Sequence, residues 1–250
     1  MRVAAFMSGS GSNMVKLIEL ARRLQTLEGV APFEVVFIFS DRSDGSCRGE
    51  QLAYKNGIPY ISHDIRAFHR RRGLKRTLNS PEGLMARKEF DRVAGKMVEA
   101  FEVDVIALGG YMSFITLDRC VNVHPADLSM LTAEGQRRYV GDHAVLDAVS
   151  AGEKVLRAST LWTDQGVDTG PLLMVSAPLS VTLPEPIEVL RKDEVRLNKV
   201  ASFHQQRLKE IGDWRIFPRT VEMIARGRFA LDEDKRVYVD GRPVPDGYRE

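Results

Sequence analysis

The sequence predicts an α/β fold with a doubly wound, mostly parallel sheet, and with antiparallel strands and further helices in the C-terminal part. Short apolar runs alternate with helical stretches over residues 1–125. A Gly-rich segment follows the first apolar run directly, which is the position of a strand–loop–helix turn. Strands that alternate with helices favour a parallel sheet, because each helix returns the chain to the same edge.

The elements of the first half follow from apolar spacing. Helices are predicted after residue 12, where Met14, Leu17 and Ile18 recur at helical intervals, before Gly57 as a C-cap, and from Pro81 onward. Five apolar runs between them predict strands at residues 3–7, 33–40, 58–62, 104–108 and 121–124.

The pattern changes after residue 155. Two apolar runs lie close enough together to pair as antiparallel strands, and helices and a hairpin follow them. No Pro/Ser-rich linker separates this region, so a single domain over residues 1–250 is expected, with halves 1–125 and 126–250. The expected elements are strands at 156–162 and 171–178, helices at 187–211 and 218–226, and a hairpin at 229–239.

Composition excludes several classes of protein. The net charge of +2 excludes a polycation, and 44% hydrophobic residues fit a globular chain. Cys47 and Cys120 cannot build a disulfide framework or a four-thiolate metal site, and His63 and His143 lack metal-ligand spacing. The N-terminal apolar run is too short for a signal peptide or a membrane span. A cytoplasmic protein without metal or membrane association is expected.

The first motif is the Gly-rich segment. Gly9 and Gly11 allow a tight turn and close approach of the backbone to an anion, and Ser10, Ser12 and Asn13 add side-chain donors. A helix N-terminus presents free N–H groups, so a phosphate is the natural ligand. The alternatives are a plain capped turn or a dinucleotide-binding loop, although the latter needs a third glycine where this chain has methionine.

The second motif ends the fifth strand. Asn122 and His124 are two residues apart, so on an extended strand they point to the same side. Open α/β sheets bind ligands at the carboxyl ends of their strands. An amide beside an imidazole predicts a pair that stabilises an oxyanion, and a structural histidine is the alternative.

The third motif brackets a Gly-rich bend with two acids, Asp164 and Asp168. A carboxylate here could pair with His124, raise its pKa and pass protons. An ordinary Asp/Gly turn is the alternative.

In this order the motifs resemble the folate-dependent formyltransferases. The matching segments are Gly9-Ser-Gly-Ser-Asn13, Gly109-Gly-Tyr-Met112, Asn122-Val-His-Pro125 and Asp168-Thr-Gly-Pro171. Residues 213–218 and 240–248 resemble the closing segment of the phosphoribosylglycinamide branch. The resemblance covers residues 1–248, with insertions, and implies a Rossmann-like formyltransferase fold.

The resemblance also implies an activity and a site. The expected reaction moves the formyl group of 10-formyltetrahydrofolate, a co-substrate, to the amine of phosphoribosylglycinamide in purine biosynthesis, without a metal. Asn122, His124 and Asp168 would be catalytic, and Asp213 would meet the ribose. Residues 9–13 would bind the phosphate. The folate would contact Arg87, Tyr111, Met112, Ser113, Phe114, Ile115, Asp164, Gln165, Gly166 and Val167.

The chain departs from the family pattern around these pockets. Ser113 stands where an arginine is usual, and Leu161 where a histidine is usual. Residues 63–85 and 126–140 are expanded. The basic tract 69–76 lies in the first expansion and could grip a polyanion, or simply be a solvated helix end. His143 could support the site.

Three functions remain open at this stage. The alternatives to phosphoribosylglycinamide are another amine, such as a nucleotide-linked amino sugar or methionyl-tRNA, and a non-catalytic folate- or nucleotide-binding role. Methionyl-tRNA enzymes carry a further nucleic-acid-binding domain, for which residues 1–250 leave no room, so nucleic acid is not expected as a partner. The chain is expected to be a monomer or homodimer.

Overall fold

The computed structural model describes residues 1–74, 78 and 80–249, and it divides into two compact units. The first unit is Met1–Val121 and the second is Asn122–Glu250. Strand β5 (Cys120–His124) carries the chain from one unit into the next. Each unit is described separately below, and the expected single-domain organisation stays a prediction.

The first unit contains the parallel part of the sheet. Its strands have the order β3-β2-β1-β4, and β1 pairs in parallel with both β2 and β4. This arrangement confirms the doubly wound pattern expected from alternating strands and helices. The strands are β1 (Arg2–Met7), β2 (Glu34–Ser40), β3 (Tyr60–Ser62) and β4 (Val105–Leu108).

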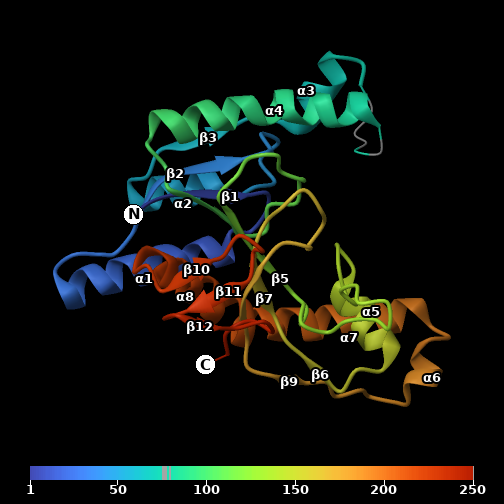
Figure 1. Ribbon diagram of the computed structural model, residues 1–250. Coiled ribbons are helices and arrows are strands. Elements are labelled where there is room, and N and C mark those ends of the chain that lie inside the picture. Colours follow the sequence, from blue (N-terminus) through green and yellow to red (C-terminus); the bar gives the residue numbers. More distant parts are fainter. Residues whose placement is uncertain (75–77, 79, 250) are drawn as a thin grey trace. The chain divides into compact units, whose positions relative to one another are not determined.

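Helices cover both faces of these strands, with α1 and α4 on opposite sides in Figure 1. Alternate residues of β1 and β2, among them Phe6 and Phe37, pack in one apolar cluster with Ala94 and Val98 of α4. The helices are α1 (Ser12–Glu28), α2 (Gly49–Asn56), α3 (Ile65–Arg71) and α4 (Pro81–Ala100).

Helix α3 was not expected from the sequence, and it lies in the expansion 63–85. Asp64 caps it, because its carboxylate accepts a hydrogen bond of 2.6 Å from the Ala67 N–H. The basic tract begins at its end, with His69, Arg70 and Arg71 in the last turn, where positive charge suits the helix dipole. Lys75 and Arg76 lie outside the described residues.

The second unit continues the sheet beyond β5 and contains its antiparallel part. The complete strand order is β3-β2-β1-β4-β5-β7-β8, which makes a mixed sheet of seven mostly parallel strands. Strands β7 and β8 pair antiparallel, as expected, and a separate antiparallel pair joins β6 and β9. These strands are β6 (Val155–Leu156), β7 (Ser159–Trp162), β8 (Leu172–Val175) and β9 (Leu179–Ser180), and α5 (Ala144–Ala151) precedes them.

The helix predicted at 187–211 is wrong as one element. It is divided because Asp193 starts a new helix, its side chain accepting from the Arg196 N–H. A π-helix then leads directly into the last helix, which begins at Trp214 rather than at Pro218. The elements are α6 (Ile187–Leu190), α7 (Glu194–Leu208), the π-helix η1 (Lys209–Asp213) and α8 (Trp214–Ala225).

The tail forms the expected hairpin with one further strand, so that a three-stranded antiparallel sheet results. Its strands are β10 (Phe229–Leu231), β11 (Val237–Val239) and β12 (Arg242–Pro243). Across the described part of the chain, every helix is too short or too polar to cross a membrane.

A buried ion pair in the first unit supports the segment that is expected to contact folate, residues 111–115. Arg87 and Asp91, one turn apart on α4, are 3% and 1% exposed. Two hydrogen bonds of 3.1 and 2.8 Å join the guanidinium to both carboxylate oxygens. The guanidinium also donates to the Tyr111 hydroxyl at 3.2 Å, and Asp91 accepts from the Thr116 N–H at 2.8 Å. The pair therefore holds both ends of segment 111–116.

We predict that Asp91→Ala will strongly destabilise the fold, by about 3–5 kcal/mol, because it leaves the buried Arg87 charge without its partner. The exposed ion pair between Arg72 and Glu89 of α4 provides the control. Glu89→Ala should leave the stability close to that of the parent, since exposed pairs contribute little. Denaturant unfolding of the three proteins measures both effects, and equal losses would contradict the prediction.

Candidate active site

Strand β5 presents the two polar side chains that the sequence singled out. Asn122 and His124 lie two residues apart on the strand, so they point to the same side, as predicted. Their neighbours Val121 and Val123 are buried in the apolar interior. Asn122 is half-buried, whereas His124 is only 5% exposed.

The His124 ring lies between two hydrogen-bond acceptors. Its Nδ1 is 3.2 Å from Oδ2 of Asp168, and its Nε2 is 3.0 Å from the Tyr139 carbonyl oxygen. A carbonyl oxygen only accepts, so Nε2 carries a hydrogen. The Asp168 carboxylate therefore faces the other ring nitrogen, and the contact becomes an ion pair when the ring takes up a second proton. The expected partnership of His124 and Asp168 is thus present.

The pKa of His124 differs from the expectation. Burial lowers the pKa of His124 below its usual value, because the imidazolium loses its hydration. The Asp168 carboxylate and the Tyr139 carbonyl raise it, but they offset only part of the effect of burial. The predicted effect of Asp168, to raise this pKa, is present, but burial outweighs it, since spacing does not reveal how deeply the ring is buried.

The loop that holds Asp168 is closed by its own side chains. Asp164 accepts hydrogen bonds from the Gly166 N–H at 2.9 Å and from the Thr169 hydroxyl at 2.6 Å. Asp168 itself has a φ of 54°, in the left-handed region that residues other than glycine adopt uncommonly. Gly170 must be glycine, because a Cβ there would lie 1.9 Å from the Trp162 carbonyl oxygen.

Sequence reasoning missed three groups that contact this pair or its loop. The Gly141 N–H donates to Oδ2 of Asp168 at 2.9 Å. Tyr139 contributes its backbone carbonyl to His124. The guanidinium of Arg137 donates to the backbone carbonyls of Asp168 and Gly170. All three lie in or beside the expansion 126–140, which was the only signal in the sequence.

The Gly-rich loop begins α1 in the first unit. Gly11 is the N-cap with a φ of 69°, and no side chain caps the helix within the described chain. The first-turn N–H groups are therefore available to a ligand. Asn13 is 7% exposed and its buried Oδ1 has no described hydrogen-bond partner, while Ser10 is exposed and Ser12 half-buried.

The segment expected to contact folate follows β4. Met112 is exposed and Phe114 half-buried, whereas Tyr111, Ser113 and Ile115 are buried. The Ser113 hydroxyl donates to Oδ2 of Asp41, at the end of β2, and the Met112 N–H donates to the Ser8 hydroxyl at 2.9 Å. Burial raises the pKa of Tyr111. Arg87, expected near the folate tail, has its guanidinium bound to Asp91 and Tyr111.

The remaining predicted residues lie elsewhere in the second unit. Gln165, Gly166 and Val167 are exposed at the tip of the loop before Asp168. Asp213 is buried in the π-helix η1, whose Gly212 packs closely: a Cβ there would lie 3.0 Å from Ala158. The His143 side chain is exposed at the start of α5. Leu161, where the family has histidine, is buried.

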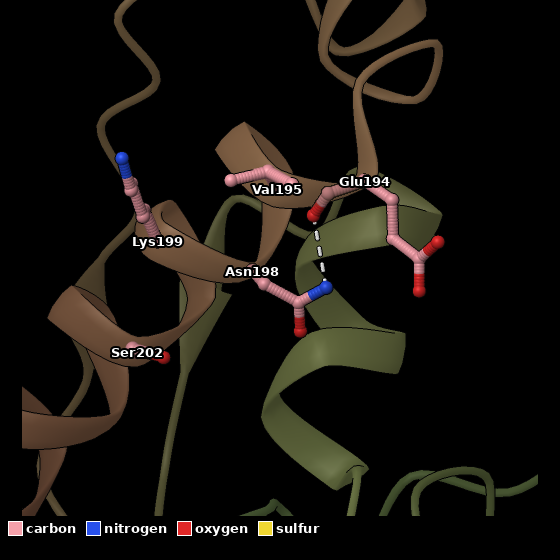
Figure 2. A pocket seen from close by; sticks show the side chains of 5 residues that line it. All are labelled: Glu194, Val195, Asn198, Lys199 and Ser202. Carbon is pink, nitrogen blue, oxygen red and sulfur yellow. Dashed lines mark hydrogen bonds between the residues drawn. The ribbon is translucent and has the colours of Figure 1, made fainter.

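A surface depression of about 520 Å³ lies along α7, away from these residues in the sequence. Figure 2 shows that its lining comes from a single helix, where the Asn198 amide donates to the Glu194 carbonyl at 2.8 Å. It contains none of the predicted site residues. No cluster of three or more metal-ligating side chains occurs among residues 1–74, 78 and 80–249. The lining residues are Glu194, Val195, Asn198, Lys199 and Ser202.

Comparison with known proteins relates the chain to a family. Residues 1–192 match the family described as "Formyl transferase". The chain is 22% identical to "Phosphoribosylglycinamide formyltransferase" of Haemophilus influenzae, covering 98% of this chain and 96% of the relative. It is 29% identical to "Trifunctional purine biosynthetic protein adenosine-3" of Drosophila melanogaster over 90% of this chain, but spans only 14% of that protein.

A solved structure has the same fold. The phosphoribosylglycinamide formyltransferase of Coxiella burnetii superimposes with a TM-score of 0.67 at 23% identity, covering 100% of this chain and 98% of that one. The family match extends over more than half of the sequence and includes Asn122, His124 and Asp168. The chain belongs to the formyl transferase family.

Proposed function

We propose that this protein transfers a formyl group from 10-formyltetrahydrofolate to the amine of phosphoribosylglycinamide, a step of purine biosynthesis. The observation that carries the proposal is the buried pair of His124 and Asp168, 3.2 Å apart, with Asn122 on the same side of β5. Such a pair can hold a proton and an amide can donate to an oxyanion, which are the two needs of acyl transfer to an amine.

The phosphate of the acceptor binds at the Gly-rich loop in this proposal. The uncapped N-terminus of α1 supplies N–H groups, and the positive end of the helix dipole favours an anion. Gly11 brings the backbone to the ligand without a side chain in the way. Asp213 and the folate-contact residues keep their roles as predictions. We further propose that the reaction takes place in the cytoplasm with small-molecule substrates only.

The chemistry proceeds through a tetrahedral intermediate. The neutral amine attacks the formyl carbon, and the carbonyl π electrons move to the oxygen. The C–N bond to the folate then breaks, its electron pair goes to the folate nitrogen, and that nitrogen takes up a proton while the attacking amine loses one. Asn122 donates to the oxyanion, and Asp168 assists the proton transfer through water. The products are the formylated amine and tetrahydrofolate.

His124 can assist only by exchanging a partner. Its Nε2–H is bound to the Tyr139 carbonyl, so the formyl oxygen must replace that carbonyl to receive the hydrogen bond. The exchange becomes favourable as negative charge develops on the formyl oxygen, because an oxyanion is a stronger acceptor than a peptide carbonyl. The contribution of His124 is therefore expected in kcat rather than in KM.

A direct assay tests the proposal. The purified protein is supplied with 10-formyltetrahydrofolate and phosphoribosylglycinamide, and formation of tetrahydrofolate and of the formylated amine is followed. Nucleotide-linked amino sugars test the other acceptors, and a reaction without amine measures hydrolysis. Turnover with a different amine would replace the acceptor, and tight folate binding without turnover would favour the non-catalytic alternative.

We predict that Asn122→Ala and His124→Ala will each lower kcat with little change in the KM values. An oxyanion donor typically contributes ~10²–10³-fold in kcat, and a positioned acid–base group ~10²–10⁴-fold.

Because residues that act together are non-additive, His124→Ala combined with Asp168→Ala should cost little more than the worse single change. Steady-state kinetics at saturating folate measure these effects, and near-parental turnover of His124→Ala would remove the mechanism.

The phosphate loop offers a matched pair of variants. A Cβ at Gly11 would lie 2.4 Å from Cε of Met7 and must adopt a positive φ, whereas a Cβ at Gly9 has no atom within 4 Å. We predict that Gly11→Val raises the acceptor KM strongly and leaves folate binding nearly intact, while Gly9→Ala changes neither greatly. Thermal unfolding shows whether both variants fold, and loss of folate binding in Gly11→Val would contradict the assignment.

The Asp168 carboxylate raises the pKa of His124 against the effect of burial. We therefore predict that Asp168→Asn lowers this pKa further, because the imidazolium loses its anionic partner. NMR titration of the imidazole signals measures the change. His63, whose pKa is lowered by its own burial in the first unit, serves as the internal control. An unchanged His124 pKa would show that Asp168 does not act on the ring, and a rise would show that it acts in the opposite direction.

A further inference from the structure

The expansion 126–140 folds into a turn that returns the chain toward the His124–Asp168 pair. Leu131 and Arg137 form an antiparallel bridge, and the Arg138 N–H donates to the Met130 carbonyl at 3.0 Å. The Thr132 N–H closes the turn on the Gln136 carbonyl at 2.7 Å. Arg137 is thus fixed on the returning arm by backbone hydrogen bonds.

From this arm the Arg137 guanidinium binds two backbone carbonyls of the loop that carries Asp168. One nitrogen donates to the carbonyl of Asp168 and the other to that of Gly170, the latter at 2.7 Å. Both partners are peptide groups, so the contact fixes the path of the loop rather than neutralising a side chain. The planar fork of arginine suits two carbonyls at once, which a lysine cannot match.

The loop needs such support at this residue. Asp168 has a φ of 54°, a conformation that is uncommon for residues other than glycine and that neighbouring contacts help to maintain. Its carboxylate reaches Nδ1 of His124 at 3.2 Å from that conformation. The same arm continues to Tyr139, whose carbonyl binds His124, and to Gly141, whose N–H binds Asp168. The turn therefore contacts the pair from both sides.

We propose that Arg137 is a positioning residue of the catalytic pair: its guanidinium holds the backbone of Asp168 so that the carboxylate meets His124. The kinetic test of this proposal rests on the proposed function, whereas the NMR titration of His124 does not. A displacement of about 1 Å at a catalytic group can cost ~10²-fold in rate. Loss of Arg137 should therefore lower kcat by ~10²-fold, with small changes in KM.

The His124 titration separates positioning from a simple charge effect. The groups that act on this ring are Asp168, the Tyr139 carbonyl, Arg137 and Asp142. The positive charge of Arg137 lowers the pKa of His124, so removal of that charge alone would raise it. If Arg137 instead holds Asp168 against the ring, its removal lowers the pKa, as Asp168→Asn does.

The experiment compares Arg137→Ala, Arg137→Lys and Arg138→Ala. Arg138 is the matched control, because its guanidinium binds Glu153 at 2.9 Å and its side chain is 45% exposed. Arg137→Ala should lower kcat and the His124 pKa, and added guanidinium ion should restore both, while sodium chloride should not. Arg137→Lys, which keeps one donor, should be intermediate and also serves if Arg137→Ala does not fold. Arg138→Ala should resemble the parent.

A raised or unchanged His124 pKa in the Arg137 variants, or no restoration by guanidinium, would overturn the positioning role. The NMR readout needs no substrate. If the parent is inactive but the His124 pKa falls in the Arg137 variants as expected, the proposed function is rejected and the role of Arg137 is kept. If the parent is active but the His124 pKa is unaltered in the variants, the role of Arg137 is rejected and the proposed function is kept.

Discussion

The candidate site in the second unit is built around one contact, between Nδ1 of His124 and the carboxylate of Asp168. Burial lowers the pKa of His124, and the Asp168 carboxylate acts against that effect. The surrounding backbone groups serve this contact: the Tyr139 carbonyl fixes the hydrogen on Nε2, and the Gly141 N–H orients the carboxylate.

The first unit relies on a different principle. The buried pair of Arg87 and Asp91 makes good bidentate geometry, and the carboxylate also accepts from Thr116. Burial of two charges is costly, so such a pair persists where it specifies a conformation. Here it orders the segment after β4, in which Met112 is exposed between buried Tyr111 and Ser113.

Much of the fold could be predicted from the sequence, because apolar periodicity decides the strands of a buried parallel sheet and the helices that cover it. The position of His124 and Asn122 on one side of β5 followed from spacing alone. The sequence does not distinguish two helices with a break before α7 from one continuous helix, because Asp193 acts as an N-cap only after the chain has turned there. The positive φ of Asp168 and the donors of Arg137 depend on tertiary contacts, which no local pattern encodes.

Two of the groups that contact the pair of His124 and Asp168 belong to the peptide backbone, namely the carbonyl at position 139 and the N–H at position 141. Every amino acid supplies the first, and all but proline supply the second. Replacement of the side chain at position 139 would therefore leave its contact in place, whereas a side chain at position 141 would have to adopt a φ of 75°. The contribution of the carbonyl at position 139 would become visible when the length of the preceding turn is altered, and that of the N–H at position 141 when its peptide bond is replaced by an ester.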